Sequence, residues 1–132
     1  MSVMQIEATT ATPAVNWQPE AGVLELTGES YPENAIEFYT PILTAVAEYL
    51  QQGEKPALRL ELNLSYLNTS SVKAMMDLLD LVEEAHGQGA MVQVNWYHDP
   101  DDDRAQEVAE EFCEDLTLPF SIKTLPSQGP RR

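Results

Sequence analysis

Residues 56–67 read PALRLELNLSYL. Apolar and polar residues alternate through this stretch, and a period of two is typical of a strand that buries one face. A strand covered by helices on both faces would be apolar almost throughout. The stretch therefore predicts a sheet with helices mainly on one face and an open polar face on the other. The expected buried face carries Leu58, Leu60, Leu62, Leu64 and Tyr66.

A second alternating stretch, MVQVNWY, follows at residues 91–97. Between the two, residues 68–89 begin with cap-forming side chains, continue with an apolar stripe and end with two glycines, which predicts an amphipathic helix. A strand, a helix and a strand in this order indicate a right-handed crossover between parallel strands. We expect the methionines of the stripe to fill core, with a partner groove as the alternative for one of them. The stripe comprises Val72, Met75, Met76, Leu79 and Val82.

The remaining segments extend this unit on both sides. Ser30 and Glu33 have the spacing of a capping box and indicate where an upstream helix begins. The expected fold class is α/β, a single mixed sheet with helices mainly on one face. Further out, the patterns predict two strands in residues 14–29, helices in 30–50 and 101–116, and a closing strand in 120–125. The apolar residues that recur at helical spacing in the first of these helices, and form its expected buried face, are Ile36, Tyr39, Ile42, Leu43, Val46 and Leu50.

The length of 132 residues suits one domain. Residues 1–13 are rich in Thr and Ala without periodicity, so we expect a flexible N-terminal arm. Residues 14–125 form the predicted domain, and residues 126–132 a frayed C-terminal tail.

The net charge is −15, from 22 acidic and 7 basic residues. This balance argues against nucleic acid or an anionic membrane as the partner. No apolar run approaches the roughly 20 residues that cross a bilayer, and no signal peptide is visible, so we expect no membrane insertion. The single cysteine, Cys113, favours a reducing compartment. The expected location is the cytoplasm.

The sequence contains no phosphate-binding glycine loop and no Cys or His pair at metal spacing. The acidic run from Asp99 to Asp103 lacks the glycine and glutamate of a calcium loop. An enzyme would need a titratable pair, and Lys73 with Asp77 or Asp80 fits a helix surface pair better. We therefore predict no enzyme activity, no cofactor, no metal and no catalytic residue.

Three consecutive hydroxyl residues, Thr69, Ser70 and Ser71, lie where the strand gives way to the helix. A helix cap accounts for one of them. A phosphoryl group there would face free backbone N–H groups at the positive end of the helix dipole. Lys73 lies one turn beyond Thr69 and is placed to pair with such a group. The cluster therefore indicates a regulatory phosphorylation site.

This cluster resembles the phosphorylation site of the STAS-like anti-sigma-factor antagonists. Over residues 14–122, the chain resembles more closely the SiaC family of biofilm-regulating phosphoproteins. That resemblance rests on three motifs: GESYPEN at 28–34, YLNTSSVKAMMD at 66–77 and AEEF at 109–112.

The resemblance implies a partner-switching protein. In that family a dedicated, SiaB-like protein kinase phosphorylates the threonine that corresponds to Thr69, and a PP2C-type phosphatase reverses the reaction. The unphosphorylated form binds and activates a diguanylate cyclase, which raises cyclic-di-GMP and promotes biofilm formation. Asn68 and Ser71 depart from the acidic residue and the glycine of the STAS pattern. Ser70 is therefore the second choice of acceptor.

The partner surface is expected on two segments around the phosphorylation site. The alternatives are a module of the anti-sigma-factor-antagonist type and an acidic decoy without a phosphoswitch. Steep salt dependence of binding favours the decoy. The expected partner-binding residues are Tyr31, Pro32, Glu33, Asn34, Asn68, Thr69, Ser70, Ser71 and Lys73.

Overall fold

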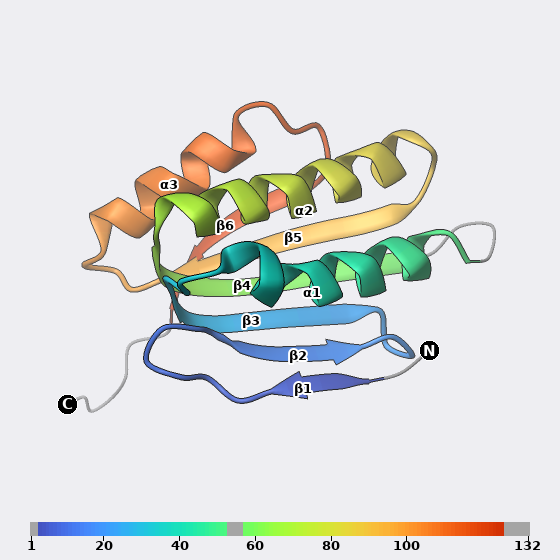
Figure 1. Cartoon of the computed structure of the whole chain (residues 1–132). Helices are drawn as coiled ribbons and strands as arrows, with labels where there is room; N and C mark the ends of the chain where they lie inside the picture. Colours follow the sequence, from blue (N-terminus) through green and yellow to red (C-terminus); the bar gives the residue numbers. More distant parts are fainter. Residues whose placement is uncertain (1–2, 53–56, 126–132) are drawn as a thin grey trace.

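The computed structural model describes residues 3–52 and 57–125, which form a mixed sheet and three helices (Figure 1). The helices are α1 (Ala35–Leu50), α2 (Thr69–Gly87) and α3 (Asp103–Cys113). The strands are β1 (Met4–Ile6), β2 (Ala14–Gln18), β3 (Val23–Ser30), β4 (Ala57–Leu67), β5 (Met91–His98) and β6 (Phe120–Thr124).

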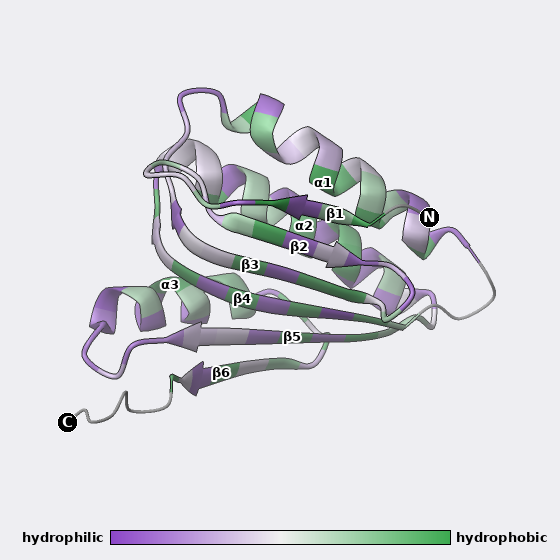
Figure 2. Ribbon diagram, turned by 90° about the horizontal axis from the view of Figure 1, so that it is seen from below, coloured by the Kyte–Doolittle hydropathy of each residue, from purple (hydrophilic) through white to green (hydrophobic). Residues whose placement is uncertain are grey.

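The six strands lie in the sheet in the order in which they occur in the chain. β1, β2 and β3 pair antiparallel, whereas β3, β4, β5 and β6 pair parallel through the crossovers that contain α1, α2 and α3. Since each crossover advances in the same direction and crossovers are right-handed, all three helices lie on one face of the sheet. Figure 1 shows this single layer of helices, and Figure 2 shows the uncovered face. The predicted α/β class and its one-sided arrangement are confirmed.

The core lies between the helices and the covered face of the sheet. The alternating leucines of β4 are at most 3% exposed, and Val94 and Trp96 of β5 lie beside them. From the helices, Tyr39 and Ile42 of α1 and Met75 of α2 close the core. The polar positions of the strands face the other way. There Glu61 accepts hydrogen bonds from Asn95 at 2.6 Å and from the Tyr97 hydroxyl at 2.7 Å.

The N-terminal segment of the chain is more ordered than its sequence predicts. Residues 1–13 were expected to form a flexible arm, but Met4–Ile6 form β1 and pair with β2. This part of the expected arm is therefore an edge strand. The amide of Tyr31 also donates to the carbonyl of Ala11 at 2.8 Å, which ties the same segment to the loop before α1. Short strands without clear alternation give no periodic signal, which explains the error. The predicted tail, residues 126–132, lies outside the described residues.

The predicted capping box is also wrong. Ser30 is the last residue of β3 and is fully buried. α1 begins five residues later, at Ala35, and the side chain of the preceding Asn34 accepts from the Glu37 amide at 3.0 Å. Asn34 is the stronger signal in retrospect, since asparagine is among the best N-caps.

The expected burial of Tyr66 is likewise wrong, because the register of β3 and β4 shifts near their ends. Gly28 pairs with Leu64, but Glu29 pairs with Tyr66, so Ser65 is an extra residue on β4. An extra residue interrupts the alternation of faces. Tyr66 is accordingly 53% exposed, although its sequence position continues the leucine pattern.

The loop between α3 and β6 is held to α2 by one carboxylate. Glu83 accepts from the Thr117 hydroxyl at 2.6 Å, from the Thr117 amide at 2.9 Å and from the Leu118 amide at 3.0 Å. These hydrogen bonds, first among them that of the Thr117 hydroxyl, lower the pKa of Glu83 below its ordinary value of 4.5. The ionised form is therefore the one that holds the loop.

We predict that Glu83→Gln lowers the free energy of unfolding at pH 7, and that the difference from the wild type disappears in acid. The folded-state pKa is lowered, so the stabilisation is present above pH 4.5 and is lost as the pH falls through the folded value. Urea unfolding at pH 7 and pH 3 measures the difference in the free energy of unfolding between the variant and the wild type. Glu84→Gln, on the same turn of α2, is the control. An equal difference at both pH values contradicts the prediction.

Candidate functional site

The candidate site lies at the edge of the sheet where the parallel strands β3 and β4 end. β3 leads into the loop before α1, and β4 leads directly into α2, so both helices begin at this edge (Figure 1). The two predicted segments, residues 31–34 and 68–73, therefore meet here. The Asn68 amide donates to the Ser30 carbonyl at 2.9 Å and joins them.

The first turn of α2 presents the predicted acceptors in different environments. Thr69 and Ser70 are exposed, whereas Ser71 is fully buried. The Asn68 side chain caps the helix by accepting from the Ser71 amide at 2.9 Å. A phosphoryl group on either exposed hydroxyl would lie at the positive end of the α2 dipole.

Beneath this turn lies a buried group of three hydroxyls. Ser30 Oγ is 2.6 Å from the Tyr39 hydroxyl and 2.7 Å from Ser71 Oγ. All three side chains are at most 1% exposed. Burial raises the pKa of Tyr39, so its hydroxyl stays protonated. This group attaches the first turn of α2 to both β3 and α1.

Two tyrosines form an exposed pair beside the acceptors. The rings of Tyr31 and Tyr66 lie 5.9 Å apart in an edge-to-face arrangement. The two residues are 41% and 53% exposed, and Ile36 on the first turn of α1 is 79% exposed. Exposed aromatic side chains are enriched at the centres of protein interfaces. The edge thus combines an apolar surface with phosphorylatable hydroxyls.

Not every predicted partner-binding residue faces solvent. Pro32 and Ser71 are buried, so their side chains take no part in the surface that a partner meets. Glu33 and Asn34 are exposed, and Asn34 is occupied as the cap of α1. Lys73 is exposed, and its ammonium group donates to the Asp77 carboxylate at 2.9 Å, as the helix spacing predicts.

A groove lies beside α2. Its volume is about 210 Å³, and it separates α2 from α3. Met76 lines it and is 49% exposed, while the neighbouring Met75 is completely buried. Met75 of the pair therefore fills the core, as expected, and Met76 lines a groove. The other lining residues are Val72, Leu79, Asp80, Glu111, Phe112, Asp115 and Leu116.

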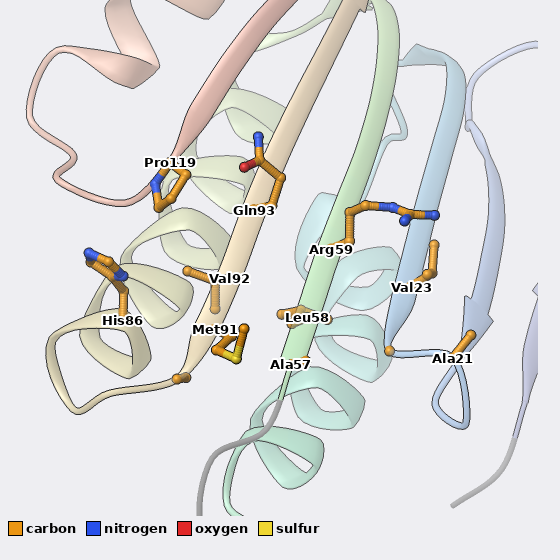
Figure 3. A pocket seen from close by; sticks show the side chains of 12 residues that line it. Ala21, Val23, Ala57, Leu58, Arg59, His86, Met91, Val92, Gln93 and Pro119 are labelled. Atoms are coloured by element: carbon orange, nitrogen blue, oxygen red, sulfur yellow. The ribbon is translucent and has the colours of Figure 1, made fainter.

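A larger hollow, of about 530 Å³, lies at the opposite edge of the sheet, where β3, β4 and β5 begin (Figure 3). Its lining is mainly apolar, with Arg59, His86 and Gln93 as the polar side chains. None of the predicted site residues lines it. The phosphorylatable hydroxyls and this hollow are thus at separate ends of the molecule.

The remaining candidates have structural roles. The Asp102 side chain caps α3 by accepting from the Ala105 amide at 3.0 Å, and Asp99 accepts from the Asp101 amide at 2.9 Å. Within residues 3–52 and 57–125, no group of three His, Cys, Asp or Glu side chains is arranged to hold a metal ion. No helix in that part of the chain is long and apolar enough to cross a membrane.

Sequence reasoning missed three residues of the site. Tyr66 was assigned to the core, Ser30 to a helix cap, and Ile36 to the buried face of α1, yet Ile36 is the most exposed of the large apolar residues described. For Ile36 a signal was available, since Ala35 and Tyr39 complete the buried stripe of α1 without it. Nothing in the local sequence reveals the extra residue on β4 that exposes Tyr66.

Comparison with known proteins gives consistent matches over nearly the whole chain. Residues 6–125 match the model of the SiaC family regulatory phosphoproteins. An uncharacterized protein of Pseudomonas aeruginosa (strain UCBPP-PA14) is 47% identical over 93% of this chain and 97% of its own length.

Solved structures agree with this match. The chain is similar to SiaC of Pseudomonas aeruginosa, at 46% identity over 95% of this chain and 100% of that one, with a TM-score of 0.88. It is also similar to a chain in the crystal structure of the diguanylate cyclase SiaD in complex with its activator SiaC, from the same organism. There the identity is 45% over 92% of this chain and 99% of that one, and the TM-score is 0.89.

We predict that Asn68→Ala lowers the free energy of unfolding by about 1 kcal/mol, because the Ser71 amide loses its acceptor. Asn68→Asp retains an oxygen acceptor and should keep most of the stability. Chemical denaturation of the three proteins checks this. An alanine variant as stable as the wild type would show that the side chain of residue 68 does not cap α2.

Proposed function

Because this chain belongs to the SiaC family of regulatory phosphoproteins, we propose that its unphosphorylated form binds and activates a diguanylate cyclase. A related activator, 45% identical, has been crystallised in complex with such a cyclase. The observation that carries the proposal for this chain is the exposed hydroxyl of Thr69 beside an exposed tyrosine pair. The chain would act by binding, in the cytoplasm, and would carry out no reaction itself.

Thr69 is the proposed acceptor of phosphate and Ser70 the second choice. Both are exposed on the first turn of α2, while Ser71 is buried and hydrogen-bonded through its hydroxyl. A kinase needs access to the hydroxyl that it phosphorylates, so burial counts against Ser71. In this proposal a SiaB-like kinase adds the phosphate and a PP2C-type phosphatase removes it.

Phosphate at Thr69 would change the surface of the protein without unfolding it. The group adds about −1.5 to −2 charges at the start of α2, where the helix dipole favours negative charge. Lys73, one turn further along α2, is 2.9 Å from Asp77 and is placed to exchange that partner for the phosphate. The folded state therefore tolerates the modification, and its effect falls on the partner.

The proposed interface centres on the tyrosine pair and Thr69. Burying an uncharged threonine beside aromatic rings costs little, whereas burying a phosphate requires removing its hydration shell. A partner that packs on Tyr31 and Tyr66 would therefore bind the unmodified form and release the phosphorylated one. Glu33, exposed in the adjacent loop, lies at the rim of this surface.

We predict that Thr69→Ala retains binding to the cyclase and that Thr69→Asp weakens it by about 5- to 150-fold, the range typical of regulatory coupling. Titration calorimetry with the cyclase of the host measures both affinities. Met91→Asp adds the same charge at the opposite edge of the sheet and serves as the control. If Thr69→Asp binds as the wild type does, the switch is not at Thr69. Affinity that neither aspartate weakens and that falls steeply with added salt favours the acidic decoy.

We further predict that Tyr66→Ala weakens cyclase binding by about 1–2 kcal/mol, typical of an aromatic interface anchor, or roughly 5- to 30-fold. Tyr66 is 53% exposed, so the stability of the fold should change little. The same calorimetric titration, with a thermal melt of each variant, makes the test. Met91→Ala, at a residue that is 69% exposed, should leave the affinity unchanged. Unchanged affinity of Tyr66→Ala places the interface elsewhere.

A further inference from the structure

The buried hydroxyls of Ser30, Tyr39 and Ser71 form a continuous chain. The Tyr39 hydroxyl lies 2.6 Å from Ser30 Oγ, which lies 2.7 Å from Ser71 Oγ. The three residues belong to β3, α1 and α2, all three are buried, and Tyr39 is part of the hydrophobic core. The Ser30 hydroxyl in the middle therefore connects three elements at one point.

Each hydroxyl in this chain depends on its neighbour, because a buried hydroxyl without a partner is costly. Ser71 cannot turn outward without leaving Ser30 with one partner fewer. Phenylalanine at position 39 would fill the same space as tyrosine apart from the oxygen atom. The hydroxyl of Tyr39 thus serves the chain and not the packing, and burial, which raises the pKa of Tyr39, keeps it protonated.

The chain of hydroxyls formed by Ser30, Tyr39 and Ser71 sets the orientation of the whole first turn of α2. Successive residues of an α-helix are rotated by about 100°, from 3.6 residues per turn. With Ser71 held inward, Thr69 and Ser70 face solvent, as both do in the structure. The Asn68 amide, bonded to the Ser30 carbonyl at 2.9 Å, fixes the residue before the turn to the same strand.

We propose that Tyr39 and Ser30 are positioning residues that determine which hydroxyl of residues 69–71 accepts phosphate. This inference rests on the proposed function, since it requires a kinase that acts on this run. In that reaction Thr69 Oγ1 attacks the γ-phosphorus of ATP, its proton passes to the kinase, and ADP leaves. The buried chain holds Thr69 in one orientation for this attack and withholds Ser71 from it.

The test compares five full-length proteins: the wild type, Tyr39→Phe, Ser71→Ala, the double variant and Tyr49→Phe. Tyr49 is the matched control, because its hydroxyl donates to the Ala57 carbonyl at the other end of α1. Each protein is incubated with ATP and the purified SiaB-like kinase of the host. Steady-state rates give kcat/KM, and mass spectrometry of the tryptic peptide from Leu60 to Lys73 locates the phosphate. Near-UV circular dichroism and thermal melts report the fold.

Tyr39→Phe should lower kcat/KM at Thr69 by about tenfold, within the range of typical coupling effects, and should place part of the phosphate on Ser70 or Ser71. Tyr49→Phe should match the wild type in rate and in site. The double variant should be no worse than the more severe single variant, because both changes break one chain. A general loss of stability would not move phosphate from one hydroxyl to another.

A folded Tyr39→Phe protein that is phosphorylated at Thr69 alone and at the wild-type rate overturns the inference. Independent, multiplying effects in the double variant overturn it as well. If Tyr39→Phe does not fold, Ser71→Ala decides the question by the same criteria. A wild-type protein that takes no phosphate on any of the three hydroxyls instead contradicts the phosphorylation part of the proposed function, and the inference falls with it.

Discussion

Burial of one face of β4 is the constraint on which the rest of the structure depends. Its leucines pair with β3 on one side and β5 on the other, and the helices cover them. Because β4 is central and parallel to both neighbours, its end brings the loop before α1 and the start of α2 to one edge. The hydrophobic effect that buries one face of β4 thus also brings the segments of the candidate site together.

The parts of the fold that follow a period were predictable from the sequence. Alternation in β4 and β5 gave the one-sided sheet, and Asn68 marked the start of α2 as a cap residue. β1 was not predicted, because a strand of three residues is too short to show a period. The capping box at Ser30 failed because the same spacing also occurs where a strand ends and no helix has begun.

The candidate site was predictable as a sequence run but not as a surface. The run of hydroxyls is visible in the sequence, yet which of them face solvent depends on contacts between distant residues, such as that of Ser30 with Ser71. The exposure of Tyr66 depends on the pairing of β4 with Gly28 and Glu29 of β3. Properties that arise from a partner strand or helix have no signal in the segment itself, and single-sequence patterns miss them for this reason.

The identity of strand order and chain order has a consequence for synthesis on the ribosome. Each strand joins the edge left by the strand before it, so none must be inserted between two that are already paired. Neighbouring elements in the chain are neighbours in space, which keeps loop closure short and favours rapid folding. Ser30, Tyr39 and Ser71 all precede β5 in the chain. The nascent polypeptide thus contains all three residues of the hydroxyl chain before β5 and β6 have been made.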